Sequence, residues 1–144
     1  MRIIDRFESF AADFEHALQD DNWSRLEKYF TEDATYLNVG GPDPTSVGRQ
    51  NVIDYLKKDV SDFDRHFDQR TLVALTPPTV EGCRLSRRWR CTYSLDGAPD
   101  LVVEGDARYL FEENLIKEIE EEATPDSMQR VDKWMQEYAE KLHI

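Results

Sequence analysis

The segment 29–48, YFTEDATYLNVGGPDPTSVG, constrains the fold most, because it lies between helical patterns. Two amphipathic helical segments precede it, and a third, residues 51–67, follows it with apolar residues at three-and-four spacing. Inside it, residues 35–39 form an expected short strand, and Gly40 and Gly41 permit a bend. A strand held between helices in this order frames a pocket.

The chain changes character after Asp68, where helical spacing gives way to extended segments. Clusters of Pro, Gly, Asp and Asn separate these segments and indicate tight turns. Successive antiparallel hairpins are therefore expected over residues 69–76, 83–95, 101–112 and 115–123.

A last helix is expected over about residues 125–142, with Thr124 as its cap and Pro125 at its first position. Its narrow apolar stripe suits packing across a sheet or against another chain. The stripe consists of Met128, Val131, Met135, Tyr138 and Leu142.

Helices followed by a curved antiparallel sheet predict an α+β fold in which the sheet wraps around the N-terminal helices, with an additional C-terminal helix. The 144 residues are expected to form one domain with a core over about residues 5–123.

Composition argues against several functional classes. The net charge of −12 disfavours binding to nucleic acid or to an anionic membrane. Asp5 and Glu8 interrupt the region where a signal peptide needs an apolar core, so a cytoplasmic protein is expected. The three histidines are scattered and no CxxC pair occurs, so neither a metal nor another cofactor is expected.

The phrases YFTEDATYLNVGGP and SVGRQNVIDYL, in this order of elements, resemble the nuclear transport factor 2-like superfamily, and its SnoaL-like branch in particular. The resemblance implies a cone-shaped fold with an apolar pocket between the concave sheet and the helices, and often a homodimer built on the outer sheet face. Members of this family include ketosteroid isomerases, polyketide cyclases, dehydratases and epoxide hydrolases, beside proteins that only bind or dimerise.

The catalytic residues of ketosteroid isomerases are not matched. The resemblance places Asn38 at the position of the carboxylate base, Phe14 at that of the tyrosine and Ala107 at that of the acid. An amide cannot abstract a proton, and neither Phe nor Ala can donate a hydrogen bond to an oxyanion.

The epoxide hydrolase pattern matches in part. Tyr36 and Asn38 occupy the positions of the residues that orient water there, and Glu121 that of the last-strand aspartate. The central Arg-x-Asp pair maps onto Arg88 and Arg90, so the proton-donating acid is missing.

Strand alternation predicts which residues face the pocket. The inward row of segment 83–95 includes Arg87, Trp89 and Tyr93, and a hairpin closed at Leu95 and Leu101 sets Trp89 opposite Ala107. The outward row then pairs Arg90 with Asp106, Arg84 with Glu112 and Thr92 with Glu104, which explains the RLSRRWR cluster as a cross-strand ladder. On the last strand, alternation puts Lys117, Ile119 and Glu121 on one face, and the family resemblance implies that this face points inward.

These observations predict a SnoaL-like pocket protein for a small apolar molecule that bears oxygen. If it is catalytic, Glu121 carries a proton while Tyr36 and Asn38 orient the reacting oxygen, in an isomerase, cyclase, dehydratase or hydrolase. The predicted ligand-binding residues are Phe14, Leu56, Arg87, Trp89, Tyr93, Tyr109 and Phe111. The alternative is a non-catalytic binding or dimerisation module of the same fold, so the sequence leaves open whether the protein is an enzyme.

Overall fold

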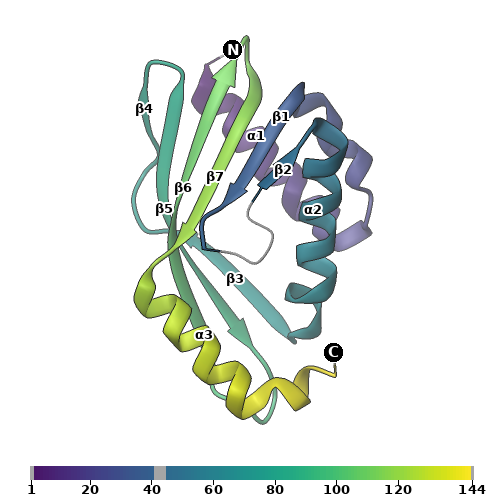
Figure 1. Ribbon diagram of the computed structural model, residues 1–144, viewed down its shortest axis with the longest axis vertical. Helices are drawn as coiled ribbons and strands as arrows, with labels where there is room; N and C mark the ends of the chain where they lie inside the picture. Colours follow the sequence, from purple (N-terminus) through teal and green to yellow (C-terminus); the bar gives the residue numbers. More distant parts are fainter. Residues whose placement is uncertain (1, 41–44, 144) are drawn as a thin grey trace.

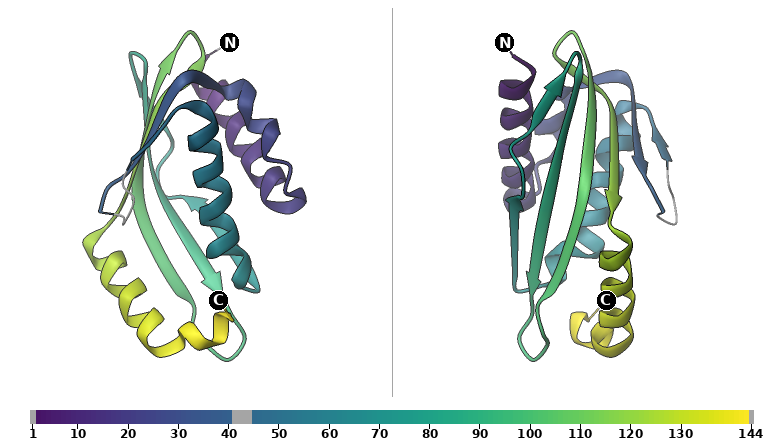
Figure 2. Two further views of the ribbon diagram at one scale, coloured as in Figure 1. Left: turned by 45° about the vertical axis from the view of Figure 1, so that its right-hand side comes forward. Right: turned by 90° about the vertical axis from the view of Figure 1, so that its left-hand side faces the viewer.

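The computed structural model describes residues 2–40 and 45–143, and these residues form a curved mixed sheet of seven strands with helices packed on it (Figures 1 and 2). Gly41, part of the expected bend, lies outside the described residues, while Gly40 has a φ of 81°. The elements are α1 (Ile3–Asp20), η1 (Trp23–Tyr29), β1 (Phe30–Asn38), β2 (Thr45–Val47), α2 (Arg49–Asp62), η2 (Asp64–His66), β3 (Gln69–Ala74), β4 (Thr79–Glu81), β5 (Arg84–Ser94), β6 (Leu101–Glu112), β7 (Leu115–Ala123), α3 (Pro125–Tyr138) and η3 (Ala139–Leu142).

The strand order β2-β1-β7-β6-β5-β3 places the first long strand beside the last. β1 runs parallel to β7, so the sheet is mixed rather than purely antiparallel as expected. β1 is also longer than the predicted 35–39, because it begins at Phe30 directly after a 3₁₀ helix. The short strands β2 and β4 were not predicted.

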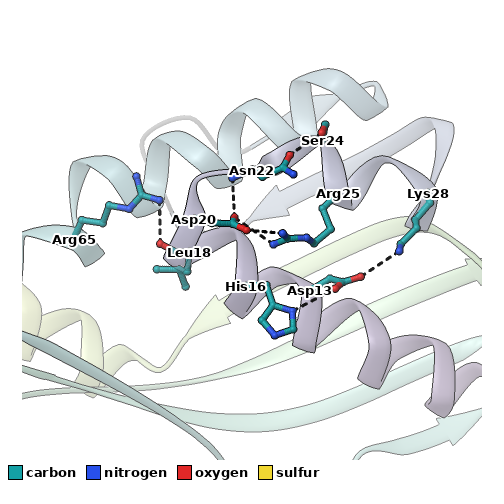
Figure 3. Close-up of polar contacts among 9 residues, drawn as sticks. All are labelled: Asp13, His16, Leu18, Asp20, Asn22, Ser24, Arg25, Lys28 and Arg65. Atoms are coloured by element: carbon teal, nitrogen blue, oxygen red, sulfur yellow. Dashed lines mark hydrogen bonds and ion pairs between the residues drawn. The ribbon is translucent and has the colours of Figure 1, made fainter.

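The main core lies between the concave face of the sheet and the helices α1 and α2. Phe7, Phe10 and Ala17 of α1 are buried there at helical spacing. Ion pairs and hydrogen bonds hold α1 to η1 and η2 on its other side: Asp13 lies 3.4 Å from Lys28, and Arg65 donates to the carbonyl oxygen of Leu18 (Figure 3). This framework fixes α1 as one wall of the interior.

The predicted third helix, 51–67, is interrupted near its end. α2 stops at Asp62, Phe63 adopts a non-helical φ of −128°, and a 3₁₀ turn follows. The interruption turns the buried side chain of Asp64 toward the sheet, where it accepts a hydrogen bond from Tyr93 at 3.2 Å.

The β5–β6 hairpin has a different register from the predicted one. Tyr93 lies opposite Leu101 and Trp89 opposite Gly105, a shift of two residues. An even shift keeps every side chain on its predicted face. Gly105 explains the register, because a Cβ at this position would lie 2.6 Å from Cζ2 of Trp89.

The outer face carries the expected cross-strand ladder with different partners. Arg88 pairs with Asp106 at 3.1 Å and Arg90 with Glu104 at 2.8 Å, whereas Arg84 lies opposite Leu110. The homodimer through this face stays a prediction.

Lys117 does not face inward as expected, because the pairing of β6 with β7 changes register. Pairing is irregular between Leu110 and Phe111, which lies opposite Ile116. Ile116 is therefore buried in place of Lys117, whose ammonium pairs with Glu112 at 2.9 Å.

The last helix begins as predicted, with the Thr124 side chain accepting a hydrogen bond from the amide of Ser127. Its buried residues are Ser127 and Trp134, of which Trp134 packs against Phe67, whereas Met128 is 40% exposed. α3 thus packs within the chain near the β5–β6 turn (Figure 1). Among the described residues, no helix has the length and apolar character needed to cross a bilayer.

Candidate functional site

A cavity of about 260 Å³ lies between the concave sheet, α1 and α2. Aromatic side chains line this volume without filling it. The predicted residues that line it are Phe14, Tyr36, Asn38, Leu56, Arg87, Trp89, Tyr93, Tyr109 and Glu121.

Phe111 does not line the cavity, which corrects the predicted ligand-binding set. It is 3% exposed and belongs to the main core. Phe111 lies opposite Ile116, close to the β6–β7 turn. It is farther along β6 than Tyr109, which lines the cavity.

The strand register explains how the central polar residues meet. Arg87, Ala107, Glu121 and Asn38 occupy one cross-strand row over β5, β6, β7 and β1. Arg87 and Glu121 are thus two strands apart, at about 4.8 Å per strand, with only the methyl group of Ala107 between them. The small residue leaves room above the sheet for both side chains.

The neighbouring row places Trp89 against Glu121. Gly105, opposite Trp89, lets the indole lie close to the sheet, and its Nε1–H donates to Oε2 of Glu121 at 3.0 Å. The small residues Gly105 and Ala107 therefore leave room for Trp89 and Arg87 to approach Glu121, although neither has a polar side chain.

Burial dominates the electrostatics of Glu121. Loss of hydration raises the pKa of its carboxyl group to about 7, against the lowering effects of Arg87 and the Trp89 hydrogen bond, and Asp59 adds a further rise. Its surface is partly accessible, because it faces the cavity. A carboxyl group that gains and loses a proton near neutral pH is suited to general acid–base catalysis.

Tyr36 and Asn38 stand on the same face of β1, beside Glu121. Asn38 Nδ2 donates to the hydroxyl of Tyr55 at 2.8 Å, and the rings of Tyr36 and Tyr55 lie 4.9 Å apart. Burial raises the pKa of Tyr36 well above its usual value, and the charge of Glu121 raises it further. Tyr36 is therefore a neutral hydroxyl that can donate a hydrogen bond.

The cavity has a second polar end, built by Arg70 of β3. Arg70 donates twice to Glu15 and lies 2.9 Å from Asp64, whose other oxygen accepts from Tyr93. The Nε of Arg70 is within ion-pairing distance of Asp64 but lacks hydrogen-bond geometry. Burial raises the pKa of Asp64 to about 6, while Arg70 opposes this rise.

The two ends are about 13 Å apart, because Trp89 and Tyr93 are separated by four residues of one strand at about 3.3 Å each. Between them the lining is largely apolar, with Leu72, Val60 and the buried thiol of Cys91. Burial raises the pKa of this thiol.

Sequence reasoning missed Tyr55, Asp59, Asp64 and Arg70. One signal was present for Asp59, which stands three residues after Leu56 and four before Phe63, inside the apolar stripe of α2. Asp59 accordingly lines the cavity, although the residue as a whole is exposed. Arg70 alternates with Leu72 on the inner row of β3 in the same way. Among residues 2–40 and 45–143, no cluster of at least three His, Cys, Asp or Glu residues could hold a metal ion.

No family model and no curated protein sequence matches the chain. Similar solved structures include Bal32a from a soil-derived mobile gene cassette, with 14% identity, a TM-score of 0.67 and coverage of 92% of this chain and 98% of Bal32a. A Bacillus subtilis protein provisionally named an isomerase has 10% identity and a TM-score of 0.65, covering 92% of this chain and 96% of its own. A Cytophaga hutchinsonii protein of unknown function, named NTF2-like, has 15% identity and a TM-score of 0.59, covering 81% and 98%. Identities this low establish a shared fold alone.

Proposed function

We propose that this chain, which has the nuclear transport factor 2-like fold, uses its cavity to move a proton on a small, largely apolar molecule that bears oxygen. The observation that supports this most is the burial of Glu121 in an open cavity, with a pKa raised to about 7. A group of this kind can act as the general acid or base of an isomerase, cyclase, dehydratase or hydrolase.

Proton abstraction beside a carbonyl group fits the arrangement of the cavity. In its ionised form Glu121 takes the proton from carbon, and the negative charge passes to the carbonyl oxygen. Tyr36 and the second N–H of Asn38 can donate to that oxygen, and Trp89 holds the carboxyl group in place. Return of the proton to a different carbon isomerises the substrate. The isomerase name of the Bacillus subtilis structure is in keeping with this chemistry but belongs to that protein.

Deuterium exchange tests the proposal without knowledge of the natural substrate. Cyclohex-2-enone and 2-tetralone are incubated with the protein in D₂O, and loss of the proton next to the carbonyl is followed by NMR. Glu121→Gln should lower the exchange rate by about 100-fold or more, since general acid–base groups contribute roughly 10²–10⁴-fold.

Glu120→Gln is the matched control, because Glu120 lies on the outer face and pairs with Arg108. Exchange that is equal in Glu121→Gln and in the natural protein would remove the proposed role of Glu121. Ketones that bind without any catalysed exchange would instead support the non-catalytic binding module.

A further inference from the structure

Tyr55 of α2 lies against two residues of β1 that line the cavity. The chain brings it there by a short path, because β2 pairs with β1 and the amide of Gly48, directly after β2, donates to the carbonyl oxygen of Ala34 at 2.8 Å. α2 begins at the next residue and packs against β1. Tyr55 stands three residues after the buried Val52 on the same helical face, so it too points inward and lines the cavity.

The hydrogen bond between Asn38 and Tyr55 fixes the plane of the Asn38 amide. Nδ2 of Asn38 donates one N–H to the hydroxyl oxygen of Tyr55 at 2.8 Å. Because the amide group is planar, the direction of one N–H also sets the directions of the second N–H and of the carbonyl oxygen. Rotation about the last side-chain bond of Asn is otherwise only weakly restricted. Tyr55 therefore decides where the second N–H of Asn38 points.

The ring of Tyr55 supports Tyr36 as well. The centroids of the two rings are 4.9 Å apart and the rings are tilted by 40°, a contact that limits rotation of the Tyr36 side chain. The pairing of β1 with β7 fixes only the backbone of these residues, with Asn38 opposite Glu121 and Tyr36 opposite Ile119. Both side chains that are proposed to hold the substrate oxygen thus depend on one residue of α2.

We propose that Tyr55 is a positioning residue, which holds the amide of Asn38 and the ring of Tyr36 in the orientation that stabilises the substrate oxygen when Glu121 takes a proton. The proposal rests on the function proposed above. It gives Tyr55 no contact with the reacting atoms, because its hydroxyl acts through Asn38. Donors that are oriented before the reaction need no reorganisation as charge develops on the oxygen, so their orientation affects turnover more than substrate binding.

Tyr55→Phe tests this role, because it removes the hydroxyl and keeps the ring against Tyr36. Exchange of 2-tetralone protons in D₂O should show a kcat about tenfold lower, since losing the orientation of an oxyanion donor costs less than the roughly 10²–10³-fold of losing the donor. KM should change by less than about twofold. The pH midpoint of exchange should stay near 7, because burial is the main cause of the raised pKa of Glu121. A loosened cavity would instead admit water to Glu121 and lower this midpoint.

The dependence on Asn38 separates positioning from a general loss of structure. In an Asn38→Ala background, Tyr55→Phe should change kcat by less than about twofold, because the amide that it orients is gone. Tyr29→Phe is the matched control: it removes a hydroxyl that donates to Asp13 away from the cavity, so kcat and KM should stay unchanged. An equal loss from Tyr55→Phe with and without Asn38 overturns the proposal, as does a kcat that Tyr55→Phe leaves unchanged.

NMR of the Asn38 side chain makes the test independent of catalysis. Its two Nδ2 protons are assigned by their absence in Asn38→Ala. The resonance of the proton that Tyr55 accepts should move in Tyr55→Phe, where the ring remains, and stay in place in Tyr29→Phe. Unmoved Asn38 resonances in Tyr55→Phe overturn the proposal. Absence of exchange in the natural protein would count against the proposed function, whereas these resonances would still decide whether Tyr55 orients the amide.

Discussion

Two faces of one sheet give identical residue types opposite roles. Glu120 and Glu122 both pair with Arg108 on the outer face, while Glu121 between them faces the cavity with its pKa raised to about 7. Likewise, Arg88 pairs with Asp106 in water, whereas the Nε of its neighbour Arg87 is buried and has no hydrogen-bond partner among residues 2–40 and 45–143. A displacement of one residue along a strand thus separates a solvated ion pair from a side chain that faces the cavity.

The largest effect should come from the inner face. The side chain of Arg70 is 15% exposed and ties α1, β3 and η2 together through Glu15 and Asp64, whereas that of Arg88 is 55% exposed. Removal of a buried ion-pair partner leaves a buried charge unpaired, so Arg70→Ala should lower the free energy of unfolding by about 3 kcal/mol or more. Arg88→Ala should lower it by about 0.2–1 kcal/mol. Urea unfolding of both variants compares the two, and equal losses would contradict the distinction between the faces.

The pH dependence of stability sharpens the comparison between Glu121 and Glu120. Between pH 4.5 and about 7 the folded protein keeps a proton on Glu121 that the unfolded chain has lost, so the free energy of unfolding falls as pH rises through this window. Glu121→Gln cannot ionise and should therefore be more stable than the natural protein by about 3 kcal/mol at pH 8, at about 1.4 kcal/mol per pKa unit.

The gain in Glu121→Gln should vanish near pH 4.5, while Glu120→Gln should show no gain at either pH. Urea unfolding at pH 4.5 and pH 8 measures both differences. A Glu121→Gln variant with the same stability difference at both values would show that Glu121 titrates normally in the folded protein.

A smaller effect is expected at Gly105, on which the Trp89 contact depends. Its Cβ would lie 2.6 Å from both the Trp89 ring and the carbonyl oxygen of Glu122. Gly105→Ala should therefore cost about 1–3 kcal/mol of unfolding free energy and shift the indole N–H resonance of Trp89, which donates to Glu121. In a Trp89→Leu background the same substitution should cost less, because one close contact is gone. An unchanged indole resonance in Gly105→Ala would refute this account of the register.

Much of the fold follows from periodicity. The strands at 101–112 and 115–123, the cap at Thr124 and the inward row of β5 were all predictable, because side chains alternate along a strand and only one face is buried. The hairpin register was missed by two residues, since alternation is blind to an even shift. The fit of Trp89 over Gly105 is a tertiary contact that no local pattern contains.

The sequence by itself determined the α+β architecture, because this depends on the period of apolar residues along the chain. Alternation also placed Tyr36 and Asn38 on one face of their strand, whereas the inward direction of Glu121 was implied by the family resemblance. The tertiary structure decided what surrounds them. It placed Ala107 between Arg87 and Glu121, joined β1 to β7, and turned Asp59 and Asp64 into the cavity. Burial of Glu121 follows from those non-local contacts, and burial is the main cause of its raised pKa.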